Sequence, residues 1–208
     1  PQTEVTLTSG FWMGRYEVTQ RQYLAVMGTN PSYYTGDLDR PVETVTWDDA
    51  VNYCAALTAQ ERATGRLPDG WEYRLPTEAQ WEYACRAGTT TQFSYGDDPA
   101  YAQLADYGWY DANSGSQTHP VGQKLPNPWG LYDMHGNVWE WCLDFYEDSL
   151  PGGSVADPVG PSSGSSRVYR GGCWEFPGQM CRSADRRRVA PSLTDRTLGF
   201  RVAAVQVR

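Results

Sequence analysis

The chain has 208 residues, and its 25 acidic and 17 Lys or Arg side chains give a formal charge of −8 at pH 7. This acidic balance argues against general nucleic-acid binding, and the nine Trp and fourteen Tyr argue against disorder. No run of about 18 apolar residues is present, so we expect no membrane insertion. A start at Pro1 without Met suggests a processed or trimmed chain. The location is left open, with an exported or cell-surface protein slightly favoured over a cytoplasmic one. The length fits one domain, residues 1–208.

Positive charge is concentrated at the end of the chain. From Arg167 onwards, nine Arg accompany three acidic residues, whereas residues 1–166 carry eight basic and twenty-two acidic residues. Two explanations are open. Either the two parts fold onto each other through Arg–carboxylate pairs in the interior, or the Arg side chains form a basic patch for an anionic ligand.

Three segments carry the signals of a helix start. Thr19, Thr46 and Thr77 are each followed three residues later by a side chain that completes a capping box. Apolar residues at helical spacing follow in each case, and Gly28 and Gly88 supply stop signals for the first and third segments. The sequence therefore predicts three helices, all within its first half.

Strand signals are short, and long loops separate them. Strand-like runs cover residues 4–7, 10–15, 138–143, 167–170 and 199–205, whereas residues 89–128 and 149–166 are rich in turn formers. Long ordered loops in a compact domain commonly need a metal ion to hold them. The pattern predicts an α+β fold with a few helices, a small antiparallel sheet and little other regular secondary structure.

Six motifs follow one another along the chain: GRYEVT (14–19), PVETVTW (41–47), RLPTEAQWEY (74–83), GLYDMHGNVWEW (130–141), RGG (170–172) and GFR (199–201). In their order and spacing the chain resembles the formylglycine-generating enzyme (sulfatase-modifying factor) family over nearly its whole length. The resemblance implies this family's variant of the C-type-lectin fold, with bound calcium. Family membership alone does not settle activity.

The resemblance also bears on catalysis. Oxidase members of the family use two Cys residues, five positions apart after the RGG motif, which bind copper(I) and convert a substrate Cys to formylglycine. Here those positions hold Phe176 and Cys181, and Phe cannot ligate a metal. We therefore expect no copper and no catalytic residues. The alternative is a copper-dependent oxidase acting on a Cys of a sulfatase or peptide, with Cys173 and Cys181 as a rearranged pair.

The resemblance implies a calcium site at Asp133, the carbonyls of Gly136 and Val138, and Glu140. Oxygen ligands of this kind suit a hard cation, although Glu140 is equally suited to pairing with an interior Arg. A second site of the family corresponds to Asp106 and Asn113 with the carbonyls of Tyr107 and Gly115.

Five Cys is an odd number, so at least one thiol is free or pairs between chains. Cys54 and Cys85 match positions that form disulfides in secreted family members, but their partners are missing, so we expect buried free thiols. Cys142 and Cys181 would bridge only in an exported protein. His135 is expected to be a packed, hydrogen-bonded side chain.

Residues 173–197 mix positions typical of the family with idiosyncratic ones. This mixture resembles the variable region of proteins that diversity-generating retroelements alter at adenine-containing codons; ordinary drift in a loop-rich paralogue is the alternative. On either explanation the segment is the candidate ligand-facing surface, because loops on a rigid scaffold carry recognition. The candidate ligand-binding residues are Trp174, Glu175, Phe176, Met180, Asp185, Arg187, Val189, Leu193 and Thr194.

Within this segment and just after it, we expect two classes of side chain. Trp174 and Phe176, with Met180, Arg187 and Leu193, should be partly exposed on one face, whereas Arg182, Arg186 and Phe200 should be buried. The chain is then a non-catalytic domain that binds a protein, peptide or glycan. Its oligomeric state is left open by the sequence.

Overall fold

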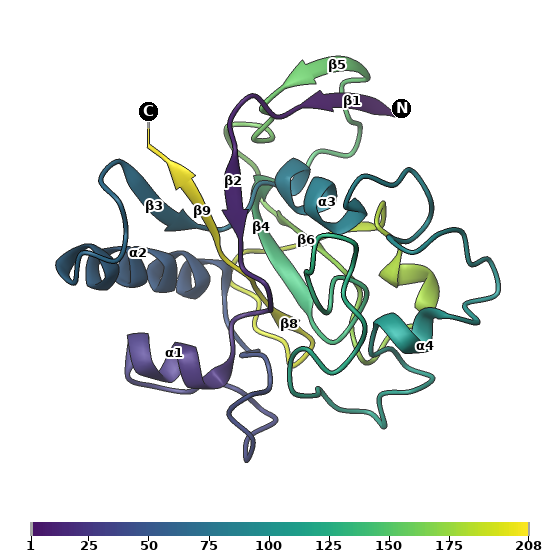
Figure 1. The fold of residues 1–208 in the computed structure, drawn as a ribbon, viewed down its shortest axis with the longest axis horizontal. Coiled ribbons are helices and arrows are strands. Elements are labelled where there is room, and N and C mark those ends of the chain that lie inside the picture. Colours follow the sequence, from purple (N-terminus) through teal and green to yellow (C-terminus); the bar gives the residue numbers. More distant parts are fainter. Residues whose placement is uncertain (1, 208) are drawn as a thin grey trace.

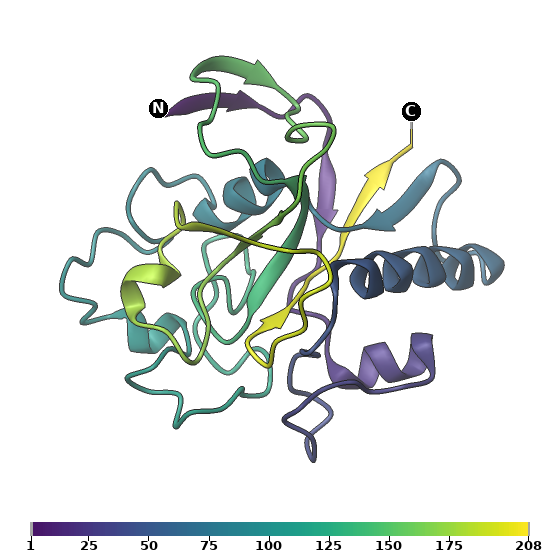
Figure 2. The ribbon, with the colours of Figure 1, turned by 180° about the vertical axis from the view of Figure 1, so that it is seen from behind.

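The computed structural model describes residues 2–207 (Figures 1 and 2). In chain order, its elements are β1 (Thr3–Thr6), β2 (Phe11–Met13), α1 (Gln20–Met27), α2 (Trp47–Ala63), β3 (Trp71–Arg74), α3 (Glu78–Arg86), α4 (Leu104–Tyr107), β4 (Trp139–Phe145), β5 (Gly153–Ala156), β6 (Arg167–Arg170), the 3-10 helix η1 (Gly178–Cys181), β7 (Arg186–Val189), β8 (Leu198–Gly199) and β9 (Ala203–Gln206). Within residues 2–207, no helix combines the length and apolar character that a membrane span requires.

The strands form three small sheets. One has the antiparallel order β2-β9-β3, a second has the order β7-β6-β4-β8, and β1 pairs with β5. Figure 1 shows α1 and α2 on one side of β2 and β9, with α3, α4 and the long loops on the other. From behind, the chain that follows β6 crosses over β4 on its way to β8 (Figure 2). The α+β fold with a small antiparallel sheet is confirmed, since β2, β9 and β3 form such a sheet. Two parallel pairs, β1–β5 and β4–β8, were not expected from the sequence.

All three helix starts are confirmed. Thr19, Thr46 and Thr77 each accept a hydrogen bond from the backbone N–H three residues later, and each donates its own backbone N–H to the side-chain oxygen of that later residue. Gly28 ends α1 in the left-handed conformation, at φ 77°. The end of α3 differs from the expectation, because Ala87 rather than Gly88 takes the left-handed position, at φ 48°.

Several strands lie where the sequence shows no strand signal. Residues 149–166, expected to be turns, contain β5, which pairs with β1 in the register Thr3↔Gly153. The expected ligand segment contains β7, and β3 was not predicted. The run at 199–205 divides into β8 and β9, because the two strands belong to different sheets and the chain crosses between them.

The core contains aromatic clusters and buried ion pairs. Tyr23 stacks on Tyr53 at 5.5 Å between ring centroids, and Phe200 meets both rings edge-on. Fully buried Arg170 pairs with Glu82, and fully buried Arg201 pairs with Glu140 at 2.6 Å. The explanation of the charge asymmetry by interior Arg–carboxylate pairs is therefore confirmed for these residues.

Candidate functional site

The start of the candidate ligand segment is fixed by buried backbone. Gly171 and Gly172 have positive φ, and a Cβ on Gly172 would lie 2.9 Å from the Cys181 Cα, so both positions favour glycine. Trp174 donates its backbone N–H to the Asn137 carbonyl at 2.9 Å and accepts from the Ser114 hydroxyl at 2.7 Å. These contacts hold the loop close to the GLYDMHGNVWEW motif.

The expectation that Trp174 is partly exposed is wrong, because only 2% of this residue is accessible. Its ring meets Tyr34 edge-on at 5.4 Å, and its indole N–H donates to the Arg196 carbonyl at 3.2 Å. The buried ring thus supports the loop from beneath. The sequence pattern identified the segment but not the inward direction of this side chain.

Residues directly after Trp174 are exposed. Phe176 is 38% exposed and lies against Trp139, and Leu193 is 41% exposed on the same segment. Glu175 and Thr194 are also exposed, and Glu175 pairs with Arg196 at 2.7 Å. These side chains match the expectation for a ligand-facing surface.

Three residues that the sequence did not single out adjoin this surface. Arg196 lies over the rings of Trp174 and Tyr33, at 5.2 and 5.9 Å from their centroids. Tyr33 is 66% exposed and meets Tyr34 edge-on. The sequence signal that could have identified the two Tyr residues is their adjacency in a loop rich in Pro, Ser, Thr and Gly.

The remaining candidate residues divide between core and surface. Met180 and Val189 are half-buried and pack against the main core cluster. Arg187 is exposed and pairs with half-buried Asp185 at 2.8 Å. The expectation that Arg182 is buried is wrong: it is exposed and holds the Gln179 carbonyl through its Nε.

Arg186 and Phe200, which were also expected to be buried, agree better with the expectation. Arg186 is half-buried and binds both carboxylate oxygens of Glu78, each at 2.7 Å. Phe200 is fully buried in the main core cluster. Arg182 and Arg186 therefore differ, because Arg182 is exposed, whereas Arg186 is half-buried in an ion pair with Glu78.

The first candidate calcium site has one carboxylate oxygen without a hydrogen-bond partner among the described residues. Asp133 is buried, accepts from the Gly122 N–H through Oδ2, and has no hydrogen-bond partner for Oδ1 among the described residues. Burial raises the pKa of its carboxyl to about 6. An orphaned buried carboxylate oxygen fits a hard cation, which would remove the cost of leaving it unpaired.

Glu140 fits that cation less directly. Both of its oxygens accept from Arg201 at 2.6 Å, and the indole N–H of Trp81 donates to one of them, also at 2.6 Å. A cation would have to share this carboxylate with Arg201. Within residues 2–207, no group of three or more His, Cys, Asp or Glu side chains is placed to hold a metal. Carbonyl oxygens would therefore supply much of the coordination.

Asn137 connects this region to the rest of the molecule. At φ 65°, its side chain donates to the Glu17 carboxylate at 2.7 Å and accepts from the His119 N–H at 2.9 Å. Its carbonyl receives the Trp174 N–H, as described above. A rearrangement of the candidate calcium loop would therefore reach the ligand segment through one residue.

The second candidate calcium set fits a cation poorly. Asp106 is exposed, and the Asn113 side chain bridges a turn, accepting from the Tyr110 N–H and donating to the Gly108 carbonyl. Positive charge is already present, because Lys124 donates to the Ala105 carbonyl at 2.5 Å. We therefore take only the first set further.

All five cysteines are buried and unpaired. Cys142 and Cys181 belong to different hydrophobic clusters and do not bridge. Burial raises the pKa of the Cys173 thiol to about 12, and burial also raises the pKa of the Cys181 thiol well above its ordinary value. Neither group is a thiolate at neutral pH, and the thiolate is the form that binds soft metals.

His135 is a structural residue, as expected. It is buried, donates through Nδ1 to the Cys181 carbonyl at 2.8 Å, and accepts from the Ser94 N–H through Nε2 at 3.2 Å. Burial lowers its pKa to about 4, so the ring is neutral at physiological pH.

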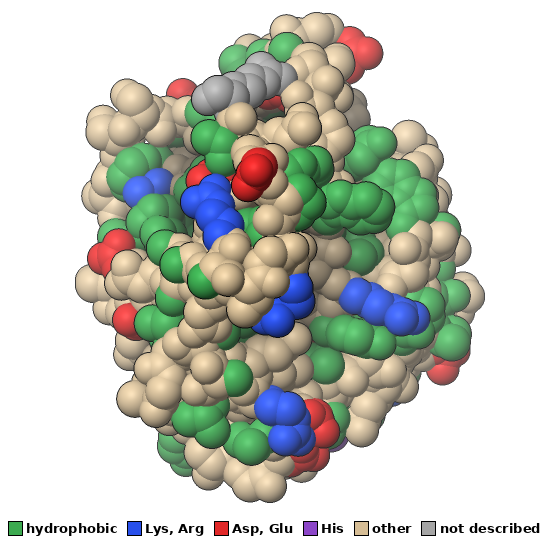
Figure 3. Space-filling model, turned by 60° about the vertical axis from the view of Figure 1, so that its left-hand side comes forward, with side chains coloured by type: hydrophobic (Ala, Val, Ile, Leu, Met, Phe, Trp, Pro, Cys, Tyr) green, Lys and Arg blue, Asp and Glu red, His purple; other side chains and the backbone are tan. Residues whose placement is uncertain are grey.

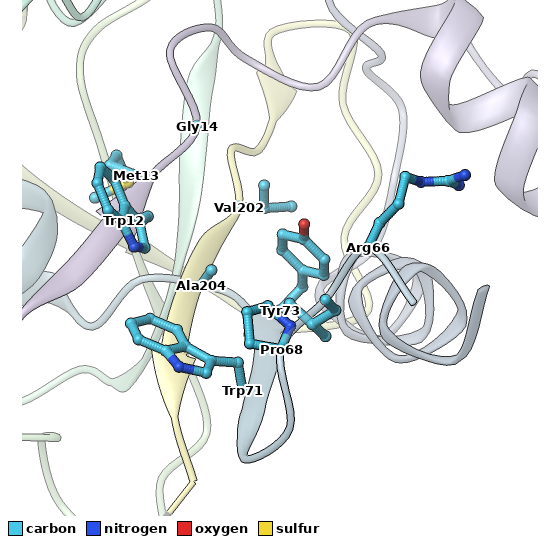
Figure 4. Close-up of a pocket in the computed structure, with 10 residues that line it drawn as sticks. Trp12, Met13, Gly14, Arg66, Pro68, Trp71, Tyr73, Val202 and Ala204 are labelled. Atoms are coloured by element: carbon cyan, nitrogen blue, oxygen red, sulfur yellow. The ribbon is translucent and has the colours of Figure 1, made fainter. Parts of the chain in front are cut away.

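An apolar hollow lies on another face of the molecule. Figure 3 brings that side forward and shows hydrophobic side chains exposed among isolated charged ones. Trp12 and Trp71 lie on either side of Ala204, on the three-stranded sheet (Figure 4). The hollow encloses about 340 Å³, and Trp12 is 74% exposed. None of the candidate ligand or metal residues lines it.

Comparison with known proteins places this architecture in a family. The family model described as "Sulfatase-modifying factor enzyme 1-like domain" matches residues 1–206, so the chain belongs to that family. The fold expected from the sequence, the formylglycine-generating-enzyme variant of the C-type-lectin fold, is the fold of its structural relatives.

Individual proteins that the chain resembles carry names of different kinds. The chain is 36% identical to "Chaperone protein LppX" of Paenibacillus barcinonensis, over 82% of this chain and 71% of that protein. It is 35% identical to the bovine (Bos taurus) formylglycine-generating enzyme, over 80% of this chain and 44% of the enzyme. A solved structure, "Treponema denticola variable protein 1", matches with a TM-score of 0.87 and 35% identity, over 96% of this chain and 85% of that one.

Proposed function

We propose that this chain is a non-catalytic ligand-binding domain, and that the exposed residues of the segment 173–197 face a protein, peptide or glycan. The observation that carries this proposal is the alternation along the segment. Buried Trp174, Cys181 and Ser183 hold the backbone, while Phe176 and Leu193 between and beyond them are exposed. Such a scaffold tolerates changes at the exposed positions without loss of the fold.

We further propose that these exposed positions are diversified. The similarity to Treponema denticola variable protein 1 supports this, as does the mixture of family-typical and idiosyncratic residues in the segment. The flanking DNA tests it. A reverse-transcriptase gene and a template copy of the last segment that differs at adenines are expected. If the flanking DNA has neither, drift in a paralogue is the better explanation.

Ligand binding by this surface can be tested with selected binders. Displayed random peptides and a glycan array are screened against the 208-residue chain, and each binder is measured against a Phe176→Ala/Leu193→Ala double variant. The matched control is Leu24→Ala/Val159→Ala, which removes similarly exposed apolar side chains elsewhere. We expect at least about tenfold weaker binding to the first variant, or about 1.4 kcal/mol, and unchanged binding to the control. Equal loss in both variants would contradict the proposal.

We propose that calcium stabilises this domain, held by Asp133, the carbonyls of Gly136 and Val138, and Glu140. The unpartnered Oδ1 of Asp133 supports a bound cation. The ion would neutralise a buried carboxylate and hold the loop that carries Asn137. Its role is structural.

A copper-dependent oxidase is the alternative function. Cys181 matches the second cysteine expected of an oxidase, and the bovine relative is a formylglycine-generating enzyme. Against it stand Phe176 at the first position and the burial of both Cys173 and Cys181. A Cu(I) titration in competition with a strong chelator, followed by oxygen consumption with a Cys-containing peptide, decides between the two. Stoichiometric copper uptake that is lost in Cys181→Ser would overturn the non-catalytic proposal, and oxygen consumption with the peptide would establish the enzyme.

A further inference from the structure

A groove lies between the loop that follows α3 and the segment that follows η1. It encloses about 550 Å³. One wall comes from the loop between Arg86 and Asp97, and the other from residues 182–187. The two walls are joined directly, because the Ser183 N–H donates to the Gln92 carbonyl at 2.9 Å.

We propose that this groove binds an acidic peptide segment, whose carboxylates pair with arginines and whose backbone donates to Gln92. The inference rests on the proposed function, because Asp185 and Arg187 belong to the candidate ligand segment and also line the groove. An acidic peptide is then the class of ligand that the segment meets on the side where Asp185 and Arg187 lie.

The charge of the groove is opposite to that of the molecule. Its lining holds four arginines, at positions 86, 182, 186 and 187, and two aspartates, at positions 97 and 185. Four positive minus two negative charges give +2, whereas the whole chain carries −8. An acidic partner is repelled by most of this molecule and attracted here, which gives specificity as well as a faster encounter.

Arg182 is the most available of these side chains. Within the described chain no carboxylate lies within ion-pair distance of it, and its Nε is held by the Gln179 carbonyl at 2.9 Å. This contact orients the planar guanidinium and leaves its terminal nitrogens for a ligand. A carboxylate is the partner that matches this geometry with two parallel hydrogen bonds.

The other arginines are paired to different degrees. Arg186 is held by Glu78 from α3, and Arg86 by Glu82 one helical turn away, so their partners largely offset both of these charges. The Arg187–Asp185 pair is partly exposed, with 43% of the Arg187 side chain accessible. Exposed ion pairs contribute little stability, so a ligand carboxylate can replace Asp185 at low cost.

A polar acceptor distinguishes a peptide from a simple anion. The side-chain Oε1 of Gln92 is buried without a hydrogen-bond partner in the described chain. An acceptor needs a donor, and leaving it unpaired costs about 1–3 kcal/mol. A peptide offers backbone N–H donors beside its carboxylates, and the buried Gln92 amide would turn toward the groove to accept one. Inorganic phosphate at neutral pH offers mainly acceptors and meets Asp97 and Asp185 in the same groove.

The test uses an N-acetylated, C-amidated hexaglutamate peptide and the matched hexaglutamine peptide, titrated into the ¹⁵N-labelled 208-residue chain at low ionic strength. We expect saturable shifts of amide resonances in residues 86–97 and 182–187 with hexaglutamate, and none with hexaglutamine. Arg182→Ala should weaken binding about tenfold. The matched control is Arg188→Ala, an exposed arginine of β7 that pairs with Asp148 outside the groove lining, and it should change binding less than twofold.

Three results would overturn the inference: no binding of hexaglutamate, binding that Arg182→Ala leaves unchanged, or inorganic phosphate that binds as tightly as the peptide. Because Arg182 is exposed, thermal melts of its variant should match the wild type, so loss of binding is not loss of fold. The Phe176→Ala/Leu193→Ala variant separates the two proposals. It should bind hexaglutamate normally, and failure of the groove leaves the test of the ligand-facing surface intact.

Discussion

At the scale of single residues, the Glu140–Arg201 pair holds the centre of the molecule. Both residues are fully buried, and Arg201 also donates to the carbonyls of Gly14 and Tyr132. The pair therefore ties the GFR motif near the end of the chain to the start of the chain and to the central motif. Burying two charges is costly, and good hydrogen-bond geometry is what offsets that cost.

Removing one charge of this pair should be strongly destabilising. Glu140→Gln keeps the shape of the side chain but leaves Arg201 as a buried charge, which costs about 3–5 kcal/mol. Urea denaturation of the variant against the wild type measures this difference. Asp39→Asn is the matched control, because Asp39 pairs with Arg21 at the surface and should cost less than about 1 kcal/mol. Similar losses of unfolding free energy in both variants would show that burial does not make the Glu140–Arg201 pair more important than a surface pair.

A second prediction concerns Asp144, whose carboxylate accepts the first backbone N–H of α3 at 2.7 Å. Burial, and then the charge of Glu78, raise its pKa from 3.8 to about 7. Because the folded pKa is raised, the folded state binds the proton more tightly than the unfolded state. The stabilisation is complete below pH 3.8 and is lost as the pH rises through 7.

Relative to Asp144→Asn, the wild type should therefore lose stability between pH 4 and 8. Three pKa units correspond to about 4 kcal/mol, an upper value for this loss. Urea unfolding of both proteins across that range measures the difference. Asp148→Asn, at a position with 78% side-chain exposure, is the matched control for the loss of a carboxylate at the surface. A constant difference between wild type and Asp144→Asn would refute the assignment.

Individual side chains were also where the sequence misled. Periodic spacing assigns residues to elements, but residues 173–197 are mostly loop, where no period fixes the direction of a side chain. Trp174 was expected outside and lies inside, and Arg182 was expected inside and lies outside. Both directions depend on contacts with distant segments, such as Tyr34 and Asn137, that a single sequence does not reveal.

At the scale of elements, helices were predictable and strands much less so. Helix caps are local, because a Thr side chain reaches a backbone N–H three residues away in its own chain. Strands need partners, and β5 pairs with β1 nearly 150 residues earlier. A strand of four residues in a Gly- and Ser-rich segment has no signal of its own, so its pairing can be seen only in the folded molecule.

The caps should contribute measurable stability. Thr46→Ala removes the hydroxyl that accepts from the Asp49 N–H and caps the first turn of α2. We expect the free energy of unfolding to fall by about 1 kcal/mol. Thermal and urea unfolding measure it. Thr35→Ala is the control, because Thr35 lies exposed in a loop, and its change should stay within about 0.5 kcal/mol. A cap variant as stable as the control would mean that tertiary packing alone sets the start of α2.

At the scale of the whole molecule, the arginines near the end of the chain divide into two groups. Arg170 and Arg201 pair with carboxylates from earlier segments and close the interior. Arg182 and Arg187 remain exposed beside a groove. The sequence alone left these explanations as alternatives, because charge counts do not say which arginines meet a carboxylate. The fold assigns Arg170 and Arg201 to the interior and leaves Arg182 and Arg187 exposed for the proposed ligand.

Calcium should stabilise the whole domain. Metal that binds only the folded state adds about 2.7 kcal/mol at a hundredfold excess over its Kd. Thermal melts of metal-free protein with calcium, with magnesium and with EGTA measure the shift, and mass spectrometry of the native protein reports bound metal. Asp133→Ala removes the unpartnered oxygen and should abolish the calcium response. A melting temperature that neither calcium nor EGTA changes, together with no bound metal by mass spectrometry, would exclude the site.

The last prediction separates the scaffold from its exposed face. Glu175, Phe176, Leu193 and Thr194 are all exposed, so each Ala substitution should change stability by no more than about 0.5 kcal/mol. The fourfold variant should then stay within about 2 kcal/mol of the wild type, because independent changes add. Trp174→Ala alone should cost about 3–5 kcal/mol, because it empties a buried site within the same segment.

Urea unfolding of the two variants beside the wild type decides the ranking. A fourfold variant less stable than Trp174→Ala would mean that these exposed side chains hold the fold together, which leaves a ligand surface no freedom to vary. The expected order requires the opposite division of roles: Trp174 fixes the loop against Ser114, Asn137 and Tyr34, and the side chains around it are free to meet a ligand.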